Sequence, residues 1–350
     1  ICPEHHKPLE RKEEEGFFFK LSDYSEWIIK YLEENPSFIT PKAKYNEIVS
    51  RLKGDDLRDL AISRPNQGWG VPVPGNDNFV MYTWFDALIN YYSALSNDQK
   101  DLWPADLHVI GKDILWFHSV IWPCMLKAAD LPLPKQVYVH GMVLAEDGKK
   151  MSKSLGNVVD PFEMLEKYPT DTFRYYMLRN ISANSDGRFS EEELISKHNT
   201  ELGNDYGNLL MRIIKLARKV LPDTVIDSKG VTQDFKIDDY LFSAKKHMDA
   251  REHNKALDKI WDLVTFLNQY INDKEPWKYK KDPEAFKAIA YNCLYGIGVS
   301  TILLKPFLPE VSAKAFSYLG TEMNIENLIN FDGHSFSLNE PEALFPKIEA

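Results

Sequence analysis

Residues 148–157 read GKKMSKSLGN and place three lysines and two serines between two glycines. Lys150 and Lys153 are three residues apart, and Ser152 and Ser154 add hydroxyl groups. Cationic side chains on a glycine-flanked loop suit a triphosphate, because the leaving pyrophosphate gains negative charge in the transition state. A solvated lysine-rich turn is the common alternative for two lysines alone. The order Lys-Met-Ser-Lys-Ser is more specific than the pair.

Two further segments combine aromatic and polar residues at helical spacing. Trp84, Leu88 and Tyr91 fall on one face of a predicted helix, because they are four and three residues apart. A second face carries three more such residues, which are Ile114, Phe117 and His118. Spacing alone favours two ordinary core faces over a binding pocket.

The second half of the chain carries another candidate set. Asn208 and Arg212 are one helical turn apart, and Pro276 and Trp277 follow much later. Asn and Arg side chains can hydrogen-bond to unstacked bases of a single-stranded RNA loop, and a Trp ring can stack on them. Solvated helix residues and a core tryptophan are the alternative.

The N-terminal residues offer half of a metal site. Cys2 and His5 have C-x-x-H spacing, which can supply two ligands to tetrahedral Zn²⁺, but no second pair lies nearby. A surface turn is the alternative. The chain starts without Met, so we interpret it as a fragment.

Composition limits the class of protein. The 350 residues have a net charge of −10 and are 44% hydrophobic, which is ordinary for a globular protein with two or three domains. Three cysteines far apart indicate a reducing compartment. We expect no membrane span, because no apolar stretch approaches about 20 residues. Acidic charge argues mildly against an RNA partner, although Arg212, Lys215, Arg218 and Lys219 form a predicted cationic strip.

The elements around these residues alternate between strand and helix. Predicted strands at 78–83, 107–111 and 136–143 each lead into a helix or the lysine loop, which indicates a parallel α/β sheet. Ligands bind at the carboxyl ends of such strands. We therefore expect Trp84, Asp86, Gly111, Asp113 and the lysine loop on one rim. From about residue 192, stripes with a period of 3.6 predict a helical bundle.

The lysine loop resembles the second signature of class I aminoacyl-tRNA synthetases. The wider stretch, HVIGKDILWFHSVIWPCML followed by VYVHGMVLAEDGKKMSKSLGNVVDP, is similar to the methionyl family, as are ISRPNQGWGVPVP, YTWFDALINYYSAL and DKEPWKYKKDPE. The first signature of the family, His-x-Gly-His, is missing from this sequence. The resemblance therefore implies the C-terminal two-thirds of such an enzyme, beginning inside its connective domain.

The implied fold is α/β plus all-α. It would be the C-terminal half of a Rossmann-type parallel-sheet catalytic domain followed by an α-helical anticodon-binding bundle. Residues 1–68 would be the rest of the connective domain, and residues 69–145 the second half of the catalytic domain. Residues 146–195 would hold the lysine loop with a stem-contact region. Residues 196–320 would form the bundle, and residues 321–350 a segment that packs back.

The resemblance implies a two-step reaction. L-methionine is activated with ATP and Mg²⁺ to methionyl-adenylate and is then transferred to tRNA(Met). Lys150 and Lys153 would stabilise the phosphates, with Lys153 the more direct contact. Gly111, Asp113 and Val143 would bind the nucleotide, although one extra residue before the lysines makes the position of Val143 loose.

The resemblance also assigns the other two sets. Trp84, Leu88, Tyr91, Ile114, Phe117 and His118 would bind methionine, and aromatic rings with a neutral His and Tyr suit an unbranched thioether. Proline often stands at Leu88 in relatives, so that wall can differ. Asn208, Arg212, Pro276 and Trp277 would read the CAU anticodon. Cys2 and His5 would be half of a zinc knuckle, in a family where some members lack the metal.

Two alternatives stay open at this point. The chain could belong to another class I synthetase, for a branched aliphatic amino acid or cysteine. It could also be a non-catalytic tRNA-binding remnant, since the first signature is missing. We expect a cytoplasmic protein, with an organellar form as the alternative; the sequence does not give the oligomeric state or show whether this chain alone is active.

Overall fold

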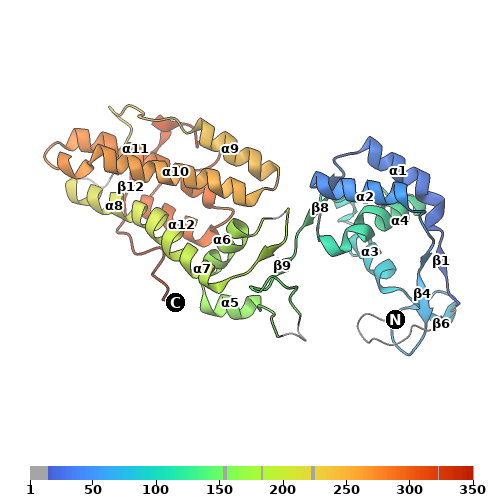
Figure 1. The fold of residues 1–350 in the computed structure, drawn as a ribbon. Coiled ribbons are helices and arrows are strands. Elements are labelled where there is room, and N and C mark those ends of the chain that lie inside the picture. Colours follow the sequence, from blue (N-terminus) through green and yellow to red (C-terminus); the bar gives the residue numbers. More distant parts are fainter. Residues whose placement is uncertain (1–14, 153–155, 183, 222–224, 322, 350) are drawn as a thin grey trace. The chain divides into compact units, whose positions relative to one another are not determined.

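The structure is a computed structural model that describes residues 15–152, 156–182, 184–221, 225–321 and 323–349. The chain divides into two compact units, Ile1–His140 and Gly141–Ala350. Each unit is described separately below, and Figure 1 gives the labels of the helices and strands.

A three-stranded parallel sheet is the centre of the first unit. Its strands are β2 (Ile39–Thr40), β8 (Val137–His140) and β7 (His108–Gly111), in the order β2-β8-β7. The register places Gly111 opposite His140, so the carboxyl ends of β7 and β8 lie side by side. The expected parallel sheet is therefore confirmed for the strand predicted at 107–111 and for the first part of the one predicted at 136–143.

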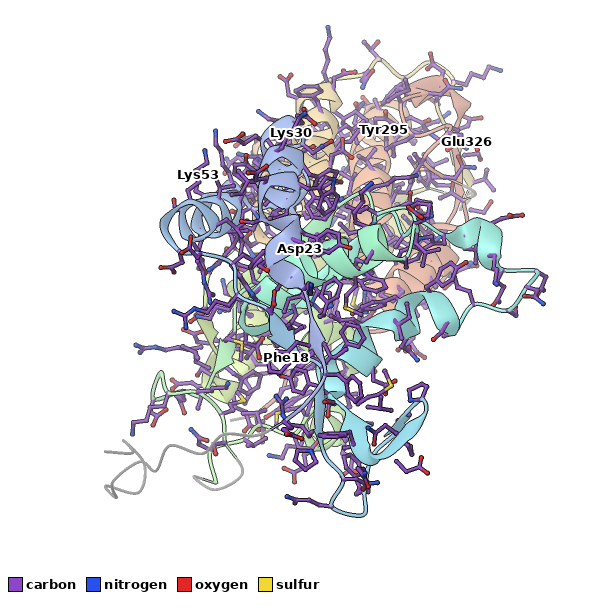
Figure 2. All side chains as sticks on the ribbon, turned by 90° about the vertical axis from the view of Figure 1, so that its right-hand side faces the viewer. Phe18, Asp23, Lys30, Lys53, Tyr295 and Glu326 are labelled. Carbon is purple, nitrogen blue, oxygen red and sulfur yellow. The ribbon has the colours of Figure 1, made fainter. Side chains whose placement is uncertain are left out.

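Helices bury their apolar stripes against this sheet. In α1 (Ser25–Glu34), Ile28 and Leu32 are four residues apart and fully buried. The stripe ends where Asn35 precedes a proline, because that position disfavours helical backbone. Charged residues lie on the outer faces, as Lys30 and Lys53 do in Figure 2. The remaining helices are α2 (Lys42–Gly54), α3 (Thr83–Ser93), the π-helix η4 (Phe117–Ile121) and α4 (Trp122–Ala128).

The strand predicted at 78–83 does not belong to the parallel sheet, so this expectation is wrong. β6 (Asn76–Met81) lies between β4 (Ser63–Pro65) and β5 (Pro72–Val73), and both pairings are antiparallel. Val73 pairs with Asn76, and Gly75 in between has a φ of +78°, which glycine adopts readily. A tight hairpin therefore joins β5 to β6. A separate pair joins β1 (Phe18–Phe19) and β3 (Leu60–Ala61).

The second unit begins with a short parallel pair. β9 (Val143–Leu144) pairs with β10 (Gly187–Arg188), so the predicted strand at 136–143 is two strands. Side-chain caps mark where two of the helices that follow begin. Asp160 accepts a hydrogen bond from the amide of Phe162 at the start of the first, and Ser190 accepts one from Glu193 at the start of the third. These helices are α5 (Pro161–Lys167), α6 (Thr170–Asn180) and α7 (Glu191–Lys197).

A helical bundle forms the rest of the second unit, as the 3.6-residue stripes predicted. It consists of the π-helix η6 (His198–Gly207), α8 (Asn208–Val220), α9 (Asp238–Asp249), α10 (His253–Lys274), the 3-10 helix η7 (Pro276–Tyr279), α11 (Pro283–Leu304) and α12 (Pro309–Leu319). The short pair β11 (Val225–Asp227) and β12 (Ser335–Ser337) is antiparallel. Near the end of the chain, the carbonyl of Pro346 lies 2.8 Å from Nε2 of His198.

Helix α11 is apolar on all sides because it lies in the middle of this bundle. By length and composition it could cross a membrane, and it is the only such helix among the described residues. The expectation that no segment has that length and composition is therefore wrong. However, 83% of its most apolar stretch is buried inside the protein, so packing in the core accounts for its composition.

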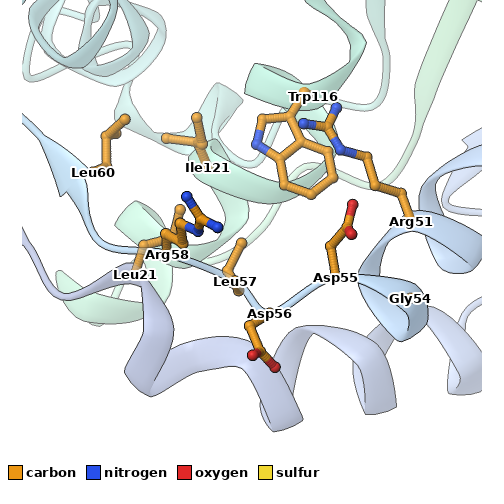
Figure 3. Close-up of a pocket in the computed structure, with 10 residues that line it drawn as sticks. All are labelled: Leu21, Arg51, Gly54, Asp55, Asp56, Leu57, Arg58, Leu60, Trp116 and Ile121. Atoms are coloured by element: carbon orange, nitrogen blue, oxygen red, sulfur yellow. The ribbon is translucent and has the colours of Figure 1, made fainter. Parts of the chain in front are cut away.

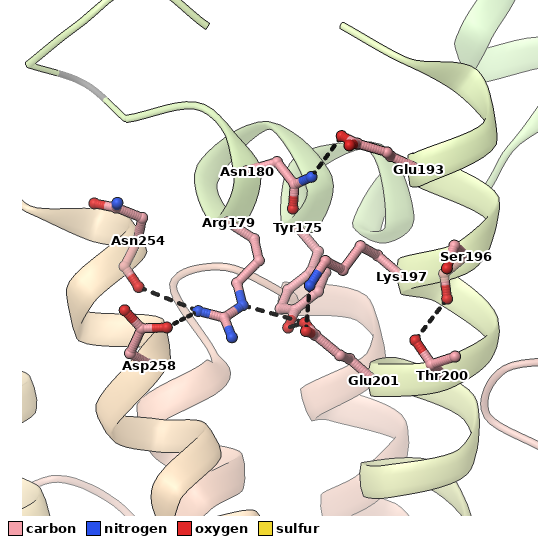
Figure 4. A network of polar contacts seen from close by, with 10 residues as sticks. All are labelled: Tyr175, Arg179, Asn180, Glu193, Ser196, Lys197, Thr200, Glu201, Asn254 and Asp258. Atoms are coloured by element: carbon pink, nitrogen blue, oxygen red, sulfur yellow. Dashed lines mark hydrogen bonds and ion pairs between the residues drawn. The ribbon is translucent and has the colours of Figure 1, made fainter. Parts of the chain in front are cut away.

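One partly buried polar network ties α6 to the bundle. The guanidinium of Arg179 donates to Glu201 on η6 with an N–O distance of 3.1 Å and also pairs with Asp258 on α10. Glu201 also accepts from Tyr175 and from Lys197, as Figure 4 shows. Three helices are thus joined through one carboxylate and one guanidinium.

Candidate functional site

The two helical faces predicted at 84–91 and 114–118 meet in the first unit. Trp84 on α3 stacks on Phe117 of η4, with ring centroids 4.6 Å apart and planes 21° apart. The hydroxyl of Tyr91 lies 2.9 Å from Nε2 of His118. Leu88 is only 1% exposed and belongs to the core, whereas Tyr91 is 41% exposed. The structure therefore brings these residues together as one aromatic and polar cluster, in which Ile114 contributes a backbone carbonyl.

Hydrogen bonding fixes the proton positions in this cluster. Nδ1 of His118 lies 3.0 Å from the carbonyl oxygen of Ile114, which can only accept, so Nδ1 carries the proton. Nε2 of the neutral ring is then an acceptor, and the Tyr91 hydroxyl donates to it. Burial lowers the pKa of His118, although its bond to Ile114 opposes the shift. The cluster is therefore neutral at pH 7.

One residue of this cluster, His108, was not predicted from the sequence. It opens strand β7 and is 5% exposed, and its ring centroid lies 4.4 Å from that of Tyr91. The indole N–H of Trp122 donates to its Nε2 at 3.3 Å. Burial, with a smaller contribution from His118, lowers the pKa of His108 to about 4. Strand alternation was the available signal, since His108 and Ile110 share the buried face of β7.

Two of the predicted nucleotide-binding residues lie at the carboxyl end of β7. A Cβ on Gly111 would lie 2.8 Å from a carboxylate oxygen of Asp113, so no side chain fits there without moving that carboxylate. Asp113 is exposed in the 3-10 helix that follows β7. This end of the sheet therefore presents an exposed carboxylate to a polar ligand. Val143 lies on β9 in the second unit, opposite Gly187.

The base of the lysine loop is ordered by short-range bonds. Lys150 forms a bridge to Leu144, and Asn157 accepts from the amide of Ser152 at 2.8 Å. Asn157 also donates to the carbonyl of Lys150 at 3.3 Å, so it joins the two ends of the loop. Lys150 is exposed. Lys153, the lysine expected to contact phosphate directly, lies outside the described residues.

The third predicted set comes together in the second unit. The guanidinium carbon of Arg212 lies 5.2 Å from the ring centroid of Trp277, and Arg212 donates to the side-chain oxygen of Asn272 at 3.0 Å. Trp277 is 37% exposed, and Pro276 before it is buried at the start of η7. Asn208 is exposed at the start of α8, one turn before Arg212. A half-exposed ring beside a cation is suited to stacking a base.

The predicted cationic strip on α8 is wrong at one position. Arg218 donates to the carbonyl of Leu338 at 2.6 Å and pairs with Glu340 at 2.9 Å. It therefore holds the C-terminal segment rather than extending the charge beside Arg212.

The structure does not test the proposed zinc ligands, because Cys2 and His5 lie outside the described residues. Within the described part of the chain, no group of three or more His, Cys, Asp or Glu side chains is arranged to hold a metal ion.

A cavity of about 650 Å³ in the first unit contains none of the predicted residues. Figure 3 shows Arg51 over the ring of Trp116 at one side of it, and Asp55 and Arg58 lie along its edge. The guanidinium carbon of Arg51 is 3.9 Å from the Trp116 centroid. The lining also includes Asp56, so the positive charges of two arginines are balanced by the negative charges of two aspartates. The cavity therefore favours neither an anionic nor a cationic ligand. A smaller cavity of about 390 Å³ is lined in part by Tyr91 and His108.

A parallel sheet, a lysine loop and a helical bundle together indicate a class I aminoacyl-tRNA synthetase. The family model described as tRNA synthetases class I (M) matches residues 2–214, and a model for the anticodon binding domain of methionyl tRNA ligase matches residues 229–350. The chain belongs to the family of class I tRNA synthetases (M).

Individual relatives agree with this assignment. The chain is 39% identical to methionine–tRNA ligase of Bacillus subtilis over 370 residues, covering 99% of this chain and 55% of that protein. It is 40% identical to the ligase of Thermotoga maritima, covering 58% of that protein. A crystal structure of Mycobacterium tuberculosis methionyl-tRNA synthetase bound by methionyl-adenylate matches with a TM-score of 0.86 and 33% identity, over 98% of this chain and 71% of that one. The chain thus spans about half the length of the curated relatives.

Proposed function

We propose that this chain is the C-terminal part of a methionine–tRNA ligase. The enzyme would activate L-methionine with ATP to methionyl-adenylate and pyrophosphate and would then transfer the methionyl group to tRNA(Met). The observation that carries this proposal is the Tyr91–His118 hydrogen bond beside the Trp84–Phe117 stack, in a chain of the class I (M) family.

The aromatic cluster is the proposed methionine site. Stacked rings offer sulfur–aromatic contacts, each contributing up to about 1.5 kcal/mol, which a thioether can use. Because His118 and Tyr91 are neutral, the cluster presents no charged group to the uncharged methionine side chain. A placed polar atom also matters because size alone distinguishes apolar side chains by about 1–3 kcal/mol per methylene.

The rim of β7 and the lysine loop are the proposed nucleotide sites. The exposed carboxylate of Asp113 can accept a hydrogen bond from a ribose hydroxyl, and Gly111, which leaves room for that carboxylate, would lie beside the nucleotide. Lys150 and Lys153 would stabilise the departing pyrophosphate, with Val143 bordering the base. Mg²⁺ would accompany ATP and neutralise part of its charge.

Domain roles follow the proposed sites. Residues 1–68 would complete the connective domain, 69–145 the catalytic half, and 146–195 the lysine loop and stem contacts. The bundle at 196–320 would bind the anticodon through Asn208, Arg212, Pro276 and Trp277, with 321–350 packed against it. We propose a cytoplasmic enzyme; Cys2 and His5 would serve a zinc knuckle only together with a second ligand pair.

Pyrophosphate exchange with each amino acid in turn tests this function in the full-length protein. Exchange with methionine alone supports the proposal. Exchange with valine, isoleucine or cysteine would assign another class I synthetase. Absence of exchange with tRNA binding retained would assign a non-catalytic RNA-binding protein. Within an active enzyme, we expect Lys153→Ala to lower the exchange rate with methionine affinity nearly unchanged, because the lysine acts on the leaving group.

A further inference from the structure

Aromatic side chains surround His108 next to the proposed methionine site. Its ring centroid is 4.4 Å from Tyr91, 5.9 Å from His118 and 6.3 Å from Trp103. The neighbours come from α3, η4 and the loop before β7, whereas His108 itself is held by the sheet. Its backbone N–H bonds to the carbonyl of Gln136 at 2.9 Å. A strand of the parallel sheet therefore carries the ring that contacts Tyr91.

One hydrogen bond fixes the orientation of this imidazole. Trp122 is fully buried, and its indole N–H can only donate. Nε2 of His108, 3.3 Å away, is its acceptor, so the neutral ring of His108 carries its proton on Nδ1. Protonation of Nε2 would point two N–H groups at each other. The lowered pKa of His108 agrees with this geometry, because the buried ring stays neutral.

Tyr91 needs such a support because it is open on one side. The residue is 41% exposed, and its hydroxyl bond to His118 joins two different helices. The His108 ring, tilted by 50° to the phenol ring, packs against its inner side. Without that ring, the phenol gains room to rotate away from Nε2 of His118.

We propose that His108 is a positioning residue for recognition of the amino-acid side chain. Its ring supports Tyr91 and so holds the Tyr91–His118 hydrogen bond in the orientation that faces the substrate. The inference rests on the proposed function, because it assigns a role within the proposed methionine site. A histidine that only filled the core would affect stability without acting through the Tyr91 hydroxyl.

Two substitutions separate these roles. His108→Gln keeps a hydrogen-bond acceptor for Trp122 but removes the ring, whereas His108→Phe keeps a ring and removes the acceptor. In pyrophosphate exchange with the full-length protein, we expect His108→Gln to raise KM for methionine about tenfold, equivalent to losing one well-placed hydrogen bond, with kcat and KM for ATP within about twofold. We expect His108→Phe to lower Tm while changing KM for methionine by less than about threefold, because the indole N–H of Trp122 loses its partner.

A double-mutant cycle with Tyr91→Phe shows whether His108 acts through Tyr91. In the Tyr91→Phe background the hydroxyl is gone, so His108→Gln should change KM for methionine by less than about twofold. The matched control is His334→Gln, which replaces another buried histidine packed beside a tyrosine, Tyr295, in the bundle. It should leave KM for methionine unchanged.

The outcomes distinguish this inference from the proposed function. A wild-type protein without methionine-dependent exchange would overturn the function and the inference together. An active wild-type with His108→Gln at wild-type KM would overturn only the positioning role. So would an equal effect of His108→Gln in both backgrounds, which would show that His108 does not act through the Tyr91 hydroxyl.

Discussion

The hydroxyl of Tyr91 lies 2.9 Å from Nε2 of His118, although the two residues are 27 positions apart and lie on different helices. The carbonyl of Ile114 holds the other nitrogen of the same imidazole at 3.0 Å. The direction of both bonds is therefore set: His118 donates to the backbone, and Tyr91 donates to His118. This pair is the polar part of the aromatic and polar cluster that also holds Trp84 and Phe117.

Tyr91→Phe tests the importance of that pair. The substitution keeps the ring and removes the donor, so we expect KM for methionine to rise about five- to tenfold with kcat nearly unchanged. Pyrophosphate exchange measures both constants. Tyr92→Phe is the matched control, since Tyr92 packs by its ring against Trp103 with centroids 5.8 Å apart. Equal effects of the two substitutions would contradict a specific role for the Tyr91 hydroxyl.

Helical spacing predicted the two faces of this cluster, whereas only the family resemblance joined them into one set. Helical spacing placed Trp84 and Tyr91 on one face and Phe117 and His118 on another, and the structure confirms that these faces meet. The contribution of His108 could not be read from spacing, because it depends on which helices cover the face of β7. Contacts between distant segments are a property of tertiary packing, which a periodic pattern does not specify.

The errors elsewhere have the same origin. The strand at 78–83 has the composition of a buried strand, but Gly75 lets the chain turn back on itself and pair antiparallel before any helix intervenes. Arg218 has the spacing of a surface cation, but the C-terminal segment supplies Glu340 and a carbonyl to bind it. In both cases, a contact with another segment of the chain decided the structure, and the local sequence pattern does not specify that contact.

Acid should destabilise the first unit through its buried histidines. The pKa of His108 falls from 6.5 to about 4 on folding, so between these pH values the unfolded chain binds more protons than the native one. Stability from this residue is therefore present above pH 6.5 and is lost as pH falls toward 4. We expect the urea midpoint to fall between pH 7 and pH 5. His108→Gln should show a smaller fall, and an identical pH dependence in that variant would contradict this assignment.

Breaking the Arg179 network should destabilise the second unit. The side chains of Arg179 and Glu201 are 14% and 15% exposed, so removing the guanidinium takes one partner from a partly buried carboxylate that keeps Tyr175 and Lys197. We expect Arg179→Met to cost about 2 kcal/mol, measured by calorimetric unfolding. Lys245→Met is the control, because Lys245 and Asp249 are 74% and 65% exposed and should contribute less than about 0.5 kcal/mol. Similar losses for both variants would show that the network adds nothing beyond a surface pair.

Trp277→Ala should separate RNA binding from amino-acid activation. The ring lies 5.2 Å from the guanidinium of Arg212 and is 37% exposed, so it can stack a base while Arg212 binds its edge. Loss of one stacking platform costs about 1–3 kcal/mol, so we expect KM for tRNA(Met) in aminoacylation to rise at least fivefold. Methionine-dependent pyrophosphate exchange without tRNA should stay at the wild-type rate. Phe242→Ala is the control, because this ring on α9 is 72% exposed and should leave both assays unchanged. If Trp277→Ala lowers exchange and aminoacylation equally, the tryptophan supports the fold rather than the anticodon.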